Sequence, residues 1–111
     1  MLDGVSASDR LLLLRFLCAF AWTDLEVSEK EQRFVRRILA QANLGPDDER
    51  QVEEWLHVAP APGSVDPKLV PRAHRKLFLD AVRALVYADG TVDPDERASL
   101  DRLRDALEAA D

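Results

Sequence analysis

Two acidic segments of this sequence carry carboxylates that could bind a divalent cation. Residues 24–31 and residues 89–96 both follow the pattern D-x-x-V-[S/D]-x-x-E. Carboxylate oxygens are the side-chain ligands that Ca²⁺ and Mg²⁺ prefer, so a weak site for either ion could form here. The candidate metal ligands are Asp24, Glu31, Asp89, Asp93, Asp95 and Glu96.

The same pattern also has a purely structural explanation as a pair of helix caps. Ser28 with Glu31, and Asp93 with Glu96, have the spacing of capping boxes, in which the cap and the third helical residue each bond a backbone N–H group. Caps alone explain less well why aspartates stand at the ends of the preceding helices, where a negative charge costs about 0.3–1 kcal/mol. A hydrogen bond to the loop backbone or a bound cation could compensate them, and both alternatives stay open at this point.

The second acidic segment resembles only the latter half of an EF-hand loop. Gly90 would occupy the turn and Glu96 the last ligand position. The positions for the leading carboxylates hold Leu85 and Tyr87, which we expect to be helix and core residues. The sequence therefore excludes a tight EF-hand site.

Other site chemistry finds little support in the sequence. His57 and His74 are separated by a proline-rich stretch and have no further ligand at helical spacing, which argues against zinc. No nucleophile stands beside a base around Cys18, Ser28 or Ser99, so we expect no enzymatic activity. Trp22 and Trp55 are expected to serve the core rather than a partner, because the chain has few other aromatic residues.

The elements that must position the acidic segments all have helical patterns. Helix caps, apolar spacing and helix-breaking residues predict a first helix from Ser6 or Ser8 to about Trp22, a second after Ser28 to about Ala42, and a third from Pro46. A fourth helix should run from about Asp66 to Ala88, with Pro71 kinking or restarting it. A fifth should start at Pro94 and carry Ala98, Leu100, Leu103 and Leu107 on one face. We expect an all-α, compact bundle of about five helices, built from two helix–acidic loop–helix repeats. One domain should span residues 1–111, with residues 1–7 as a loose tail.

Composition limits the possible partners. The chain has 111 residues and a formal net charge of -6, which disfavours nucleic acid because phosphate backbones are bound through surplus Lys and Arg. A basic or membrane-associated protein partner fits better. The apolar run at residues 11–21 is interrupted by Arg15 and is shorter than the ~20 residues of a membrane span, so neither insertion into a membrane nor a signal peptide is expected. The prediction is a cytoplasmic protein, with Cys18 as a buried small side chain.

The string from Ala88 to Glu96, Ala-Asp-Gly-Thr-Val-Asp-Pro-Asp-Glu, resembles the second motif of the TerB-like, or tellurite-resistance, domain family. Residues 16–39 resemble the first motif, although Leu25 replaces the usual glycine. The family includes the N-terminal domain of DjlA-type co-chaperones. The resemblance implies an all-helical cytosolic domain that is linked to chemical and metal stress and binds divalent metal, without an established reaction.

Together these observations predict a non-enzymatic binding module related to stress response, with weak divalent-cation binding at the acidic loops. The alternative is a protein-interaction or dimerisation module, including a homodimer, in which the acidic loops are only helix caps.

Overall fold

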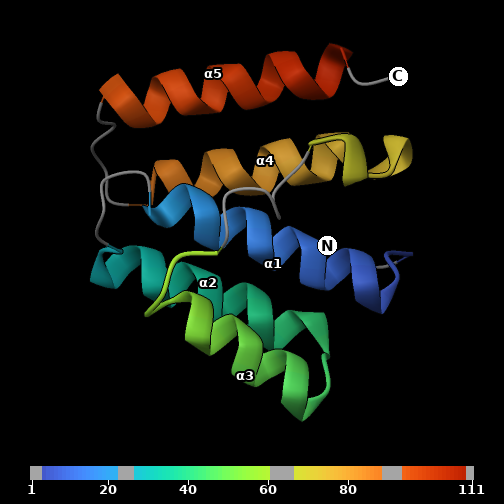
Figure 1. The fold of residues 1–111 in the computed structure, drawn as a ribbon, viewed down its shortest axis with the longest axis vertical. Helices are drawn as coiled ribbons and strands as arrows, with labels where there is room; N and C mark the ends of the chain where they lie inside the picture. The colour runs from blue at the N-terminus through green and yellow to red at the C-terminus, as the bar shows by residue number, and fades with distance from the viewer. Residues whose placement is uncertain (1–3, 23–26, 61–66, 89–93, 110–111) are drawn as a thin grey trace.

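Five α-helices make up most of the chain in the computed structural model, which describes residues 4–22, 27–60, 67–88 and 94–109 (Figure 1). They are α1 (Ala7–Ala21), α2 (Glu29–Ala42), α3 (Pro46–Trp55), α4 (Arg75–Val86) and α5 (Pro94–Ala109), with two short 3-10 helices, η3 (Pro67–Leu69) and η4 (Arg72–His74), before α4. The described residues contain no strand. The all-α prediction is therefore confirmed.

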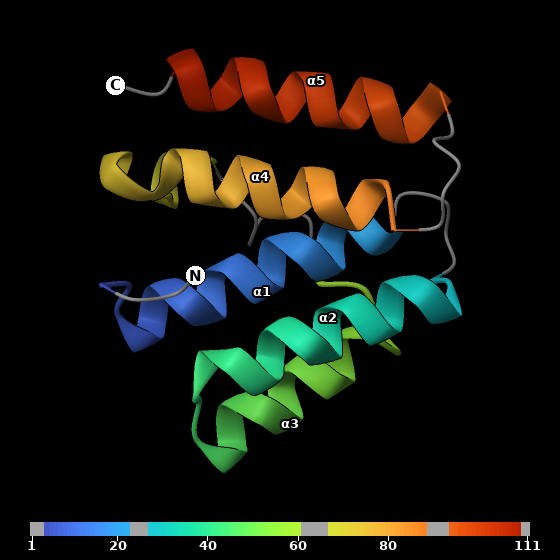
Figure 2. The ribbon, with the colours of Figure 1, turned by 180° about the vertical axis from the view of Figure 1, so that it is seen from behind.

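Helix α1 lies at the centre of the bundle. It packs against α2, α3 and α4, and Figures 1 and 2 show it between the α2–α3 pair and α4. Leu13, Leu14, Leu17 and Cys18 on this helix are fully buried. A helix that is apolar on nearly every side must be covered on nearly every side, which explains the central place of α1.

Helix α4 separates α1 from α5. The ring of Phe78 on α4 meets the ring of Phe16 on α1 edge to face, with centroids 5.6 Å apart. Helix α5 packs on the other side of α4 through its buried Leu100, Leu103 and Leu107 (Figure 1). Ala98 is exposed, so it does not belong to the buried face that the spacing predicted.

Local signals define several helix boundaries. The hydroxyl of Ser6 accepts a hydrogen bond from the Asp9 N–H group at 3.2 Å and caps α1. Asn43 ends α2 in the left-handed conformation, with φ of 50°, which asparagine tolerates better than most residues. Pro46 occupies the first turn of α3, where its missing N–H group costs no hydrogen bond.

Two boundaries differ from the sequence-based expectation. Helix α4 begins at Arg75, because the extended ψ of 138° at Pro71 interrupts the helical path, and residues 67–69 and 72–74 form 3-10 turns instead. The predicted loose tail is too long, since Val5 is only 4% exposed and its carbonyl accepts a hydrogen bond from Arg10 Nε at 2.9 Å. Burial of one apolar side chain therefore ties the chain to the core from residue 5.

Among the described helices, none combines the length and apolar character needed to cross a membrane.

Candidate functional site

The helix ends that flank the two acidic segments lie at one end of the bundle. Helix α1 ends there at Ala21 and α2 begins there at Glu29. Helix α4 also ends there, at Val86, and α5 begins there, at Pro94. Figure 1 shows these four ends on the left, and Figure 2 shows them on the right. We call this side of the molecule, defined by the four helix ends, the acidic end.

At the acidic end, Ser28 and Glu31 form a capping box at the start of α2. The Ser28 hydroxyl accepts a hydrogen bond from the Glu31 N–H group at 3.1 Å, and Glu31 Oε1 accepts one from the Ser28 N–H group at 3.0 Å. Glu31 is 4% exposed, and Val27 just before the cap is buried. The carboxylate of Glu31 therefore already has a structural role.

The other candidate ligands cannot be placed around Glu31. Asp24, Asp89, Gly90 and Asp93 lie outside the described residues, and so do the side chains of Asp95 and Glu96. Within the described part of the chain, no three His, Cys, Asp or Glu side chains gather as a metal-binding group. The candidate donors are all carboxylates, a set that fits Ca²⁺ or Mg²⁺.

Replacing Ser28 with alanine should lower the free energy of unfolding by about 1 kcal/mol, because the N–H group of Glu31 loses its acceptor. Urea unfolding of Ser28→Ala and of Ser28→Thr would measure this cost. Threonine keeps the hydroxyl, so this variant should retain most of the stability. Equal losses in both variants would mean that the hydroxyl does not stabilise the helix.

The expectation that Tyr87, at the end of α4, is a core residue is wrong. Tyr87 is 51% exposed and follows the last residue of α4, so it is not a core residue. Its N–H group donates to the Arg83 carbonyl at 3.1 Å, and the Ala88 N–H group donates to the Leu85 carbonyl at 3.0 Å. Leu85 is fully buried, as expected. Neither side chain could supply a leading carboxylate.

The two histidines and the cysteine belong to no metal-binding group among the described residues. His57 is exposed after α3, whereas His74 is half-buried just before α4. Cys18 is buried in the core, as predicted, and burial raises the pKa of its thiol to about 12. A thiol with so high a pKa is a poor nucleophile at neutral pH.

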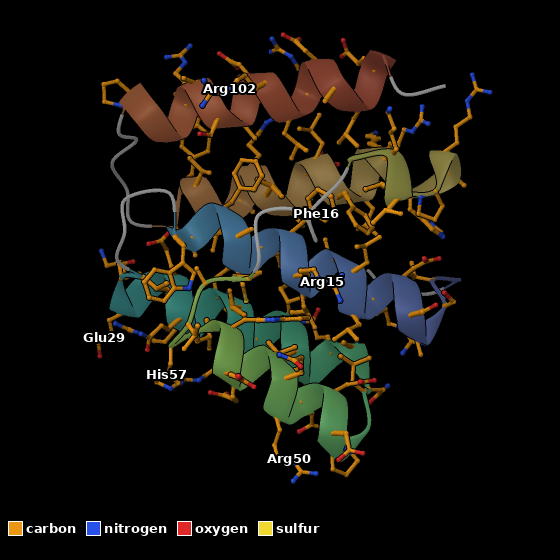
Figure 3. The ribbon with its side chains drawn as sticks, viewed as in Figure 1. Arg15, Phe16, Glu29, Arg50, His57 and Arg102 are labelled. Carbon is orange, nitrogen blue, oxygen red and sulfur yellow. The ribbon has the colours of Figure 1, made fainter. Side chains whose placement is uncertain are left out.

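The two tryptophans join the C-terminal ends of α1 and α3. Trp22 is half-buried, and its Nε1–H group donates to the Trp55 carbonyl at 2.7 Å, which satisfies an acceptor that has no partner inside α3. Trp55 is buried, and the guanidinium of Arg15 lies 5.1 Å from its ring centroid. In Figure 3, Arg15 and Phe16 can be located along α1. Both tryptophans therefore serve packing between helices, with Trp22 only partly covered.

A groove of 420 Å³ lies between α2 and α3, with its charges largely paired. It is lined by Arg36, Leu39, Ala40, Asn43, Leu44, Glu49 and Glu53. Arg36 donates two hydrogen bonds to the Glu53 carboxylate, each at 3.1 Å. These hydrogen bonds lower the pKa of Glu53. Among the charged residues that line this groove, the pair leaves only Glu49 without an ion pair in the described part of the chain.

A second groove, of 340 Å³, lies between α2 and α4 and has a different character. It is lined by Lys30, Arg33, Phe34, Arg37, Ala84 and Ala88, and we call it the basic groove. The sequence alone does not reveal this groove, because its walls come from segments far apart in the chain. The spacing of Lys30, Arg33 and Arg37 predicts a row of cations on one face of α2, but not the second wall, which comes from residues 84 and 88.

The sequence and the fold were compared with models of known protein families, with curated proteins and with solved structures, and no match was found.

Proposed function

We propose that this chain is a TerB-like, non-enzymatic binding module of the cytoplasm, which takes part in a response to chemical stress. The proposal rests on the two acidic motifs and on their resemblance to that family. The all-helical bundle is compatible with it. In this proposal the whole of residues 1–111 forms one domain.

The proposed activity is weak binding of Ca²⁺ or Mg²⁺ at the acidic end. The observation that carries it is the gathering of the four helix ends that flank both acidic segments (Figures 1 and 2). The helices that flank both acidic segments therefore begin or end on the same side of the molecule. Carboxylates that gather on one side of a protein raise the local concentration of divalent cations, and the proposal is that those of the two acidic segments do so here.

A second candidate function is protein interaction or dimerisation, with the acidic loops serving only as caps. The capping box at Ser28 favours it, since one oxygen of the Glu31 carboxylate already accepts a backbone hydrogen bond. A carboxylate with one oxygen already in a hydrogen bond is a weaker cation ligand. The acidic surface would then engage a basic or membrane-associated partner.

Thermal unfolding with and without divalent cations separates the two candidates. After chelation, Mg²⁺, Ca²⁺, Mn²⁺ or Zn²⁺ is added to the wild type and to the double variant Asp89→Asn, Glu96→Gln. A cation at a hundred times its dissociation constant adds about 2.7 kcal/mol, which should raise the midpoint by roughly ten degrees or more.

The matched control is Asp105→Asn, Glu108→Gln, which removes the same charge from the exposed C-terminal part of α5. We expect a cation-dependent rise in the wild type and in this control but not in the Asp89, Glu96 variant. If no ion raises the midpoint of the wild type, the cation proposal is wrong and the second candidate is favoured.

A further inference from the structure

We propose that the basic groove between α2 and α4 binds an acidic peptide segment of a partner protein, with an apolar side chain seated between its cations. This site adjoins the proposed cation site, since Lys30 lies within the first acidic segment and Ala88 directly precedes the second, but its lining carries the opposite charge. It also differs from the basic partner expected from the net charge of -6.

The three cations of the basic groove are exposed and largely uncompensated. Lys30, Arg33 and Arg37 are spaced along one face of α2 and are all exposed. Arg33 approaches Glu29 at 4.0 Å, and both of these side chains are well exposed to solvent. Within the described residues, Lys30 and Arg37 have no ion pair. Such a row of charges is available to carboxylates from outside.

The floor of the basic groove is apolar. Phe34 on α2 is half-buried, and the floor also contains Ala84 on α4 and Ala88, which lies two residues beyond the end of α4. These two small side chains leave room for a larger side chain of a partner. A peptide that alternates carboxylates with one bulky apolar residue would therefore match both the charge and the shape of the groove.

The negative end of the α4 dipole balances only part of the positive charge of the three cations in the groove. A helix C-terminus carries the equivalent of about half an elementary charge, and the groove brings three whole cations to the last turns of α4. A nucleic-acid backbone is a poorer match, because its binding needs an extended surplus of Lys and Arg and the chain as a whole is acidic. The apolar floor also favours a peptide side chain.

Fluorescence anisotropy would test this proposal with a fluorescein-labelled probe peptide, Glu-Glu-Asp-Leu-Phe-Asp-Glu-Glu. The control peptide replaces each acid with its amide. We expect the acidic peptide to bind at least about tenfold more tightly than the amide peptide, with an affinity that falls as salt is added. Chelator in every sample keeps the result independent of the cation proposal.

Three variants identify the surface that the probe uses. Arg33→Glu, Arg37→Glu reverses two groove charges, and the matched control Arg50→Glu, Arg102→Glu makes the same change on α3 and α5, where Figure 3 shows both side chains at the outer surface. Ala84→Trp fills the groove without changing its charge. Circular dichroism checks that each variant is folded, which we expect because all five positions are exposed.

We expect the groove reversal and Ala84→Trp each to weaken probe binding about tenfold or more, and the control to change it by less than about threefold. The proposal is overturned if the wild type does not prefer the acidic peptide, if both charge reversals weaken binding equally, or if Ala84→Trp has no effect. Two further results would also overturn it. One is binding of a single-stranded oligonucleotide in place of the peptide, and the other is self-association through the groove, seen by sedimentation.

Discussion

Replacing Phe78 with alanine is expected to lower the free energy of unfolding by about 3–5 kcal/mol. Phe78 is fully buried in α4, and its ring contacts that of Phe16 in the central helix. Truncation removes the aromatic contact and leaves a cavity that both helices line. Since a small domain is stable by only about 5–15 kcal/mol, this is a large part of the total. Urea unfolding followed by circular dichroism would measure it.

The matched control for this prediction is Phe34→Ala, the same chemical change at a phenylalanine that is only half-buried. Less apolar area returns to water at that position, so its cost should be less than half that of Phe78→Ala. The reverse order would contradict the central packing of α4 against α1.

The second large effect is expected for Arg10→Ala, at about 2 kcal/mol. Arg10 Nε donates to the Val5 carbonyl at 2.9 Å, and Nη1 donates to the carbonyl of Ala42, the last residue of α2. The guanidinium thus joins the start of α1 to the end of α2, where carbonyls lack helical partners and a positive charge is favourable. Its loss leaves both carbonyls without this donor.

Two variants control for this result in urea unfolding. Arg50→Ala removes an exposed guanidinium that pairs with Asp47 on the same helix, and should cost at most about 0.5 kcal/mol. Arg10→Lys keeps the charge but not the two-pronged geometry, so its cost should be intermediate. If Arg10→Ala and Arg50→Ala cost the same, the bridge between the two helices contributes nothing to stability.

The helices themselves could be predicted from local sequence signals. The cap at Ser28, the proline at Pro46 and the apolar spacing of α5 each act within a turn or two of the chain, so they operate without knowledge of the fold. The prediction failed where tertiary contacts decide. Burial of Val5 shortened the predicted tail, and the 3-10 turns around Pro71 delayed the start of α4 to Arg75.

The candidate sites also differ in whether local sequence signals could predict them. The repeated acidic pattern and the capping box at Ser28 could be identified from residue types and spacing. The basic groove could not, because Arg33 on α2 and Ala84 on α4 are distant in the chain and meet only when the two helices pack. The charge of a groove depends on which elements form its walls, and composition reports only the sum over the whole chain.

The sequence by itself determined that this protein is helical, that it carries two acidic helix–loop–helix units, and that α1 must be buried on nearly every side. These properties follow from propensity, capping and periodicity, which act over a few residues. Only the tertiary structure decided that the helix ends of both units meet at one acidic end, that Arg10 joins α1 to α2, and that a row of cations on α2 lines a groove against α4. The physical reason is that distances between remote segments are set by how apolar faces pack together, and local sequence does not encode them.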